Sequence, residues 1–449
     1  MWVRAVLLAA ALVVLAPLGA RAADLVVWWE KGYYPQEDQA VEEVVAAFEA
    51  KTGKKVDLSF PLSEEIRTKA RAAVEAKQPP DFLFSLNVQG PIYEWAYNDQ
   101  LVDLSDAVEP FRHLFAPEAM ELATLFNART GQRGLYALPM GRATHHVHVW
   151  KSLLERAGLT LADIPKEWEP FWSFWCDRVQ PAVRRATGRD DIWGVGLPVS
   201  LADDTHIEFW QFQLAYEADW ASAQGRLRVD DPAVRARLIK ALEAYTAIWR
   251  KGCTPPDAVT WTDSGNNKAF LAQKVVMTPN STLSIPNALR GTRPEDFHKN
   301  VVTIEWPADA YGQPLRIDGV HYRAAVLKHG EHEVVAKEFV RFLVGEGWLA
   351  HWLNFAGDRF LPPMPSLLDQ PFWLDPNDPH RMRAAMQVLT RPGAIDPFLL
   401  AHEDKARAFR ELRDKGGWGK AVHRVAAERI SPEQAVDEVI ARVKQILSE

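Results

Sequence analysis

The alternation of strand-like and helical segments near the start of the chain constrains the fold more than any other feature of the sequence. The segments follow one another as strand 24–29, helix 37–52, strand 55–60, helix 63–78, strand 81–86 and helix 91–99. The first helix has an apolar face that includes Val41, Val44 and Phe48, and Gly53 follows it as a C-cap. Strands that alternate with helices of this length predict a mostly parallel α/β sheet.

Similar patterns continue through the rest of the chain. Further strands are predicted at 133–140, 144–150, 275–277, 301–304 and 322–327, and further helices at 152–157, 167–179, 231–251, 331–343 and from 431 onward. Asp231 and Pro232 form an N-cap with proline at the first helical position. No Gly/Ser-rich linker divides the chain, and its length suits two domains. We therefore expect two lobes that are joined by several chain crossings.

Residues 1–22 have the pattern of a secretory signal peptide. Arg4 precedes an apolar run at 5–18, and Ala20 and Ala22 hold the small-residue positions before a cleavage site. The run is too short to span a membrane, which takes about 20 apolar residues. We expect cleavage after Ala22. Since no cysteine follows that site to carry a lipid, we expect an exported protein of the periplasm.

The net charge excludes some classes of binding partner, and the two cysteines leave one structural question open. Removal of residues 1–22 leaves 427 of the 449 residues and changes the formal net charge from −7 to −9. An acidic chain is poorly suited to nucleic acid or to an anionic membrane surface, so we expect neither partner. Cys176 and Cys253 could pair in an oxidising compartment or remain buried thiols.

Nine short motifs occur in a fixed order along the chain. They are FEAKTGKKV at 48–56, PDFL at 80–83, LVDL at 101–104, GLYALP at 134–139, LLERAGL at 153–159, PKEW at 165–168, FLAQKVVM at 270–277, AKEFVRFL at 336–343 and LP at 361–362. With this set, the chain resembles the maltose-binding-protein-like solute-binding proteins of ABC transporters, which are the extracellular solute-binding proteins of bacterial family 1.

The resemblance implies an α/β fold of the periplasmic binding protein type (class II), with two lobes, a ligand cleft between them and multiple hinge crossings. Lobe 1 would hold residues 24–142 and 308–358, and lobe 2 would hold residues 143–307 and 359–449. The ligands of this family are mainly sugars, oligosaccharides and polyols, with some glycerol phosphates. Its lobes close over the ligand and present it to the permease subunits of the transporter. We expect a monomer without a cofactor.

The residues after the first predicted strand are the leading candidates for ligand contacts. Trp28, Trp29, Lys31 and Tyr33 follow or end this strand, and ligands of open α/β sheets bind beyond the carboxyl ends of strands. Indole rings stack on the C–H faces of sugars, and the chain has 18 tryptophans, although most of these are expected in the core. Strand alternation directs one of the two tryptophans here into the core. The pattern favours a carbohydrate.

Further candidates follow other strand ends or lie in polar loops. They are Ser85 and Asn87 after the third strand, Arg142 and His145 at the expected hinge, Trp261, Asp263, Asn280 and Ser281 in lobe 2, Asp318, Gly319 and His321 in the return to lobe 1, and Arg359 before the late Leu-Pro segment. The guanidinium of Arg142 could donate to two vicinal hydroxyls or to a phosphate. Each of these residues could instead have a structural role.

Metal binding and catalysis find little support in the sequence. His145, His146 and His148 are close together, but strand alternation turns His145 away from the other two, and zinc would need further ligands. The chain has no G-x-S-x-G, H-E-x-x-H or Walker motif. We expect buried, hydrogen-bonded histidines, no metal site and no enzyme.

Our interpretation is therefore the substrate-binding component of an ABC importer for a mono- or short oligosaccharide or a polyol. Two alternatives stay open. One is a binder of glycerol phosphate or another small anion, held by Lys31, Arg142 and Arg359. The other is a secreted carbohydrate-active enzyme, which would need two carboxylates on either side of a bound sugar.

Overall fold

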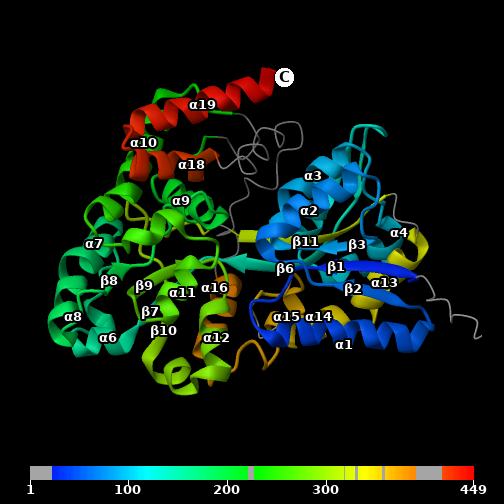
Figure 1. Ribbon diagram of the computed structural model, residues 1–449, viewed down its shortest axis with the longest axis horizontal. Coiled ribbons are helices and arrows are strands. Elements are labelled where there is room, and N and C mark those ends of the chain that lie inside the picture. Colours follow the sequence, from blue (N-terminus) through cyan, green and yellow to red (C-terminus); the bar gives the residue numbers. More distant parts are fainter. Residues whose placement is uncertain are drawn as a thin grey trace, which may run out of the picture.

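The computed structural model describes residues 23–220, 227–317, 319–328, 332–355, 359–390 and 417–448. These residues form two bodies that lie side by side, each built around its own β-sheet (Figure 1). The predicted signal peptide and the predicted site residue Asp318 lie outside the described residues. The α/β class expected from the alternating segments is confirmed.

The first sheet has five strands in the order β2-β1-β3-β11-β6. They are β1 (Leu25–Trp29), β2 (Val56–Ser59), β3 (Phe82–Phe84), β6 (Leu138–Thr144) and β11 (Gly319–Val326). β1 pairs in parallel with β2 and β3, whereas β11 pairs antiparallel with β3 and β6. The carboxyl ends of β1, β2 and β3 therefore meet at one edge of this sheet.

The second sheet has four strands in the order β10-β7-β9-β8. They are β7 (His146–Trp150), β8 (Trp193–Val195), β9 (Val275–Asn280) and β10 (Val301–Ile304), and a separate two-stranded sheet pairs β4 (Thr124–Asn127) with β5 (Gln132–Leu135). The single strand predicted at 133–140 is wrong, because the chain leaves β5 at Leu135 and enters the first sheet only at Leu138. Between them, the Tyr136 amide donates to the Ala123 carbonyl at 3.2 Å.

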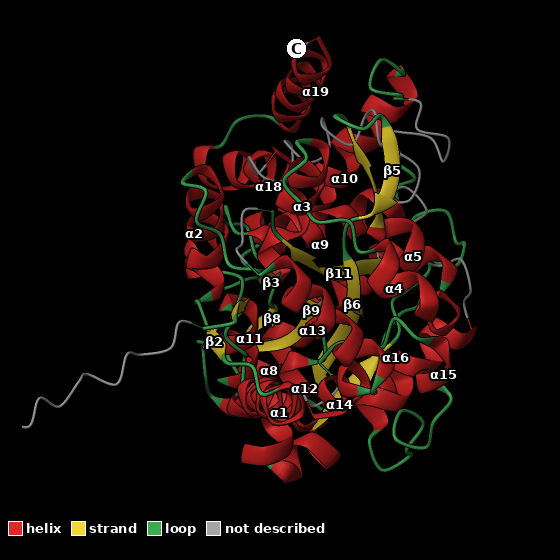
Figure 2. Ribbon diagram, turned by 90° about the vertical axis from the view of Figure 1, so that its right-hand side faces the viewer, coloured by secondary structure: helices red, strands yellow, loops and turns green. Residues whose placement is uncertain are grey.

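Helices enclose the strands of both bodies (Figure 2). With the first sheet lie α1 (Pro35–Thr52), α2 (Ser63–Glu75), α3 (Gln89–Tyr97), α4 (Ser105–Val108), α5 (Pro117–Ala123), α13 (Glu333–Gly345) and α14 (Trp348–Phe355). With the second lie α6 (Lys151–Arg156), α7 (Trp168–Ser173), α8 (Gln180–Thr187), α9 (Asp203–Ala215), α10 (Pro232–Arg250), α11 (Gly265–Leu271), α12 (Ser284–Thr292), α16 (Pro379–Thr390), α18 (Gly417–His423) and α19 (Pro432–Ser448), and α15 (Pro365–Leu368) precedes α16.

Two helix ends follow directly from their local sequence. Gly53 has a φ of 70°, which a side chain would disfavour, and its amide donates to the Glu49 carbonyl at 2.8 Å to end α1. Asp231 accepts a hydrogen bond from the Ala233 amide at 2.9 Å at the start of α10. Both predicted caps are confirmed.

The two sheets have separate hydrophobic cores, and the chain passes between them more than once. It leaves the first sheet after β6 and enters β7 two residues later, then returns between β10 and β11. Leu315 and Ile317 pack in the second core, whereas Phe360 packs in the first. This packing favours later lobe boundaries than the predicted 308 and 359, and the lobe limits stay a prediction.

A disulfide joins Cys176 and Cys253, whose Cα atoms are 5.1 Å apart. The sequence left pairing open, and the structure favours the paired form. Such bonds persist in oxidising compartments. Among the described residues, we find no helix with both the length and the apolar character that a membrane span requires.

Candidate ligand-binding cleft

A cavity of about 230 Å³ lies between the two bodies. The first body contributes residues that follow β1 and β3, the start of α2 and Tyr322 on β11; the second contributes the first turns of α9 and α11 and the chain between β9 and α12. The cavity thus lies beyond the carboxyl ends of β1, β3 and β9, where ligands of open α/β sheets bind. Its volume is just below the roughly 300–1,000 Å³ of drug-sized pockets, which suits a small solute.

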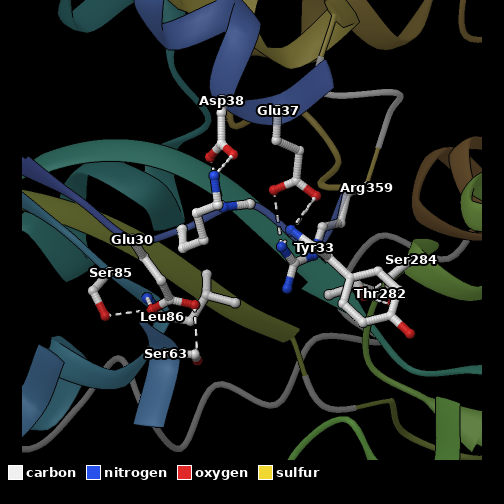
Figure 3. A network of polar contacts seen from close by, with 12 residues as sticks. Glu30, Tyr33, Glu37, Asp38, Ser63, Ser85, Leu86, Thr282, Ser284 and Arg359 are labelled. Atoms are coloured by element: carbon white, nitrogen blue, oxygen red, sulfur yellow. Dashed lines mark hydrogen bonds and ion pairs between the residues drawn. The ribbon is translucent and has the colours of Figure 1, made fainter. Parts of the chain in front are cut away.

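Glu30 organises the first wall of the cleft (Figure 3). Its side chain is buried and accepts hydrogen bonds from the Ser85 hydroxyl at 2.5 Å, the Leu86 amide at 2.9 Å and the Ser63 hydroxyl at 3.0 Å. Asn87 in turn donates to the Ser63 hydroxyl at 2.7 Å. One carboxylate therefore ties the ends of β1 and β3 to the start of α2.

The two cations of the cleft are both paired with acids in the first turn of α1 (Figure 3). The Lys31 ammonium forms an ion pair with Asp38. The Arg359 guanidinium contacts both Glu37 oxygens, at 2.9 and 3.1 Å. Burial alone would lower the pKa of Arg359, but the Glu37 and Glu30 carboxylates raise it above its ordinary value, so Arg359 stays charged. Neither cation is left to neutralise a ligand by itself.

An amide-rich wall faces these groups from the second body. Asn280 donates to the Thr282 carbonyl at 2.7 Å and accepts from Asn266 at 3.2 Å. Asn267 donates to the Ser284 hydroxyl at 3.0 Å. Burial raises the pKa of the Tyr33 phenol, and the Asn267 side chain and Arg359 partly offset this effect. Tyr33 from one body and Asn267 from the other thus lie close together across the cleft.

Three aspartates form the remaining wall. Asp203 forms an ion pair with Arg67 of α2, which links the two bodies directly. The Asp204 amide donates to the Asp263 carboxylate at 3.2 Å. Burial and the neighbouring Asp203 carboxylate raise the pKa of Asp263 to about 6, and burial, with repulsion from nearby acids, raises the pKa of Asp204 well above its ordinary value.

The structure brings together seven of the sixteen residues that sequence analysis proposed. These seven line the cleft: Lys31, Tyr33, Asn87, Asp263, Asn280, Ser281 and Arg359. They come from both bodies and from chain segments far apart in the sequence. The cleft is therefore polar and lined by residues of both bodies.

The three proposed tryptophans lie elsewhere. Trp29 is buried in the first core, where its ring packs against Phe82 and Phe84 at centroid distances of 5.9 and 5.0 Å. Trp28 points the other way along the strand and lies under the Lys69 ammonium, 5.4 Å from its ring centroid. Trp261 is buried in the second core. Among the described residues, the aromatic side chains that line the cleft are tyrosines, Tyr33 and Tyr322.

The other proposed residues support the cleft or the region where the chain crosses. Ser85 lies behind the cleft and donates to Glu30. Arg142 is buried on β6, where burial lowers its pKa to about 10, and its nearest carboxylate, Glu118, is 3.5 Å away. His145 is buried 3.6 Å from Glu208, and His321 is buried on β11, which Gly319 begins. None of these residues lines the described cavity.

Sequence reasoning missed several lining residues, chiefly Asp203, Asp204, Asn267 and Ser284. The two aspartates occupy the first turn of α9, where acids are common because they favour the helix dipole. Asn267 lies one turn into α11, and no local pattern marks it. The only local signal in the sequence is the pair of adjacent acids, Asp203 and Asp204.

The histidine cluster is structural in the described residues. His148 bonds to the Thr303 hydroxyl at 3.0 Å and His146 to the Thr144 hydroxyl at 3.2 Å, while His145 faces Trp306 on the other side. The predicted split of the three side chains is confirmed. No group of three or more His, Cys, Asp or Glu that could hold a metal occurs in the described ranges.

Comparison with known families gives one match over most of the chain. Residues 43–382 match the model of a family described as bacterial extracellular solute-binding protein. The match spans more than half of the chain. A comparison with curated protein sequences gives no match.

Solved structures with the same fold cover nearly the whole chain. A solute-binding protein of an ABC transporter from Thermotoga lettingae, bound with α-D-tagatose, has a TM-score of 0.76 at 17% identity, covering 94% of this chain and 99% of the other. Maltose-bound MalE3 of T. maritima has a TM-score of 0.72 at 16% identity over 94% and 99%. A ribitol complex from Agrobacterium radiobacter K84 has a TM-score of 0.69 at 17% identity over 94% and 98%. The two-lobe periplasmic binding protein fold is thereby confirmed.

Proposed function

This chain belongs to the family of bacterial extracellular solute-binding proteins, and on that premise we propose that its interlobe cleft binds a carbohydrate for an ABC importer. The observation that carries the proposal is a cavity between the two bodies whose lining is rich in amide, hydroxyl and carboxylate groups. Sugars and polyols present dense sets of hydroxyls, each able to donate and accept. The solved relatives described above hold tagatose, maltose and ribitol.

The arrangement of charges favours a carbohydrate over a small anion. An anion would need cations without partners, yet Lys31 is paired with Asp38 and Arg359 with Glu37. Arg142, the third cation of the anion hypothesis, is not part of the described lining. Five carboxylates in the lining would further repel a phosphate; they belong to Glu30, Glu64, Asp203, Asp204 and Asp263.

The remaining parts of the function follow from the same premise. Binding would be accompanied by closure of the lobes, with the Arg67–Asp203 ion pair between α2 and α9 as one contact that favours the closed form. The closed protein would deliver its ligand to the permease subunits as a monomer in the periplasm, after cleavage of residues 1–22. The disulfide is consistent with that compartment.

A thermal-shift screen of purified protein tests the proposal. We expect stabilisation by at least one sugar, oligosaccharide or polyol; a ligand at 100 times its dissociation constant adds about 2.7 kcal/mol. Glycerol 3-phosphate and inorganic phosphate are the controls for an anion site. Stabilisation by these anions alone, lost at moderate salt, would contradict the carbohydrate proposal.

The same preparation tests the enzyme alternative. Family members are substrate-binding proteins, so we expect each stabilising saccharide to be recovered intact after prolonged incubation with the protein. Release of reducing ends over time, abolished in the Asp263→Asn variant, would instead assign a hydrolase.

A further inference from the structure

Asp204 and Asp263, two neighbouring carboxylates of the cleft, form no ion pair among the described residues, although Arg359 and Arg67 lie near enough to offset part of their charge. Glu30 accepts three hydrogen bonds, and Asp203 is paired with Arg67. The Asp204 carboxylate has no hydrogen-bond donor or ion-pair partner in the described ranges, and it lies beside Asp263, whose oxygen already faces the Asp204 amide at 3.2 Å. The second body thus presents two adjacent acids to the cavity.

The surroundings of this pair are mostly acidic. Asp263, Glu208 and Asp203 all repel charge on Asp204, and Arg359 from across the cleft is the cation that offsets them. The N-terminus of α9 favours a nearby negative charge. A helix terminus carries only about half a unit charge, so it offsets only part of the repulsion between these two partly buried carboxylates.

A separate group in the same cavity also lacks a donor. Asn267 is 4% exposed and lines the cleft, and its side-chain oxygen has no hydrogen-bond partner in the described part of the chain, although its nitrogen donates to Ser284. A buried acceptor without a donor destabilises the protein, and a ligand that donates to it removes this cost. The Asp204, Asp263 and Asn267 side chains of the second body thus each present an acceptor oxygen to the same cavity, across from the Arg359 guanidinium.

A ligand that satisfies Asp204, Asp263 and Asn267 must carry hydrogen-bond donors and a positive charge at one end. We propose that the solute bound in the cleft is an amine-bearing sugar or polyol, whose ammonium group is held between Asp204 and Asp263 and donates to the Asn267 oxygen. This inference rests on the proposed carbohydrate function and narrows its ligand class. An ammonium has three donors and no acceptor, which matches the three acceptors. The hydroxyls of the same ligand would contact the neutral amide side chains and Tyr33.

Calorimetric titration with two matched pairs tests the inference. The pairs are D-glucosamine against D-glucose and D-glucamine against D-sorbitol, which differ by one amino group in place of a hydroxyl. We expect the amine of at least one pair to bind at least tenfold more tightly than its neutral partner. Asp204→Asn and Asp263→Asn should each remove this preference, while Asp257→Asn, an exposed acid of the same body, should preserve it.

A second measurement does not depend on the choice of sugar. Because removal of one negative charge relieves repulsion, the ligand-free Asp204→Asn protein should melt at a higher temperature than the wild type, and Asp257→Asn should not. A lower melting temperature for Asp204→Asn would overturn the inference.

The outcomes separate this inference from the proposed function. Equal or tighter binding of the neutral sugars overturns the amine inference and leaves carbohydrate binding intact. Binding only of saccharides outside the two pairs has the same consequence. If no saccharide binds, the amine inference and the proposed carbohydrate function are both overturned. Stabilisation by calcium chloride alone, lost in Asp204→Asn, would assign a cation site instead and also overturn the inference.

Discussion

The buried ion pair between Glu37 and Arg359 provides a quantitative test of how the cleft is held together. The side chains are 7% and 13% exposed, and the guanidinium contacts both carboxylate oxygens. Removal of one partner of such a pair leaves an uncompensated buried charge, which costs about 3–5 kcal/mol. We expect Arg359→Met to lower the free energy of unfolding by that amount, and Glu37→Gln with Arg359→Met to recover most of the loss.

Urea denaturation of the three proteins measures these differences, with the ion pair between Arg235 and Asp437 as the matched control. That pair has contacts of 2.6 and 2.8 Å, but its side chains are 40% and 54% exposed. Exposed pairs contribute at most about 1 kcal/mol, so Arg235→Met should change little. A loss below about 1 kcal/mol for Arg359→Met, or no recovery in the double variant, would refute the argument.

Three further predictions concern the rest of the chain. The disulfide links cysteines 77 residues apart, so the double variant Cys176→Ser, Cys253→Ser should lose about 4 kcal/mol of unfolding free energy, measured by urea denaturation. An unchanged denaturation midpoint would contradict formation of the disulfide. Burial lowers the pKa of His146 and His321 to about 3, which disfavours their charged forms in the folded state. In the unfolded chain each histidine has a pKa of about 6.5 and takes up a proton below that pH. The free energy of unfolding should therefore fall as the pH drops from 6.5 toward 3, by about 1.4 kcal/mol per pH unit for each histidine. The melting temperature should fall between pH 6.5 and 4.5, with a smaller fall in His146→Gln. N-terminal sequencing of periplasmic protein should begin at Ala23, and a start at Met1 would contradict export by a cleaved signal.

Local patterns predicted the fold well where a single physical preference decides the structure. Alternation in β1 buries Leu25, Val27 and Trp29, and Gly53 ends α1 because its backbone is left-handed. The sequence could not separate β5 from β6, because both are extended and the break at Tyr136 depends on a tertiary hydrogen bond to Ala123. Strand propensity contains no information on which sheet a strand joins.

The site was harder to predict than the fold because burial and pairing decide which polar groups reach the cleft. Arg142 and Asn280 both follow strands predicted from the sequence, yet Arg142 is buried within β6 and only Asn280 lines the cavity. Lys31 reaches the cleft as predicted, but its pairing with Asp38, seven residues later, removes it as an anion-binding group. This ion pair depends on how the loop after β1 folds against α1, and the spacing of residue types in the sequence does not reveal that.

A crystal structure of the protein with a stabilising saccharide tests the central claim most directly. The account predicts density for the sugar in the cavity between the two bodies, with hydrogen bonds to Asn267 and Asn280 on one wall and contact with Tyr33 on the other. Density for the saccharide at any other surface, with this cavity unoccupied, would contradict it.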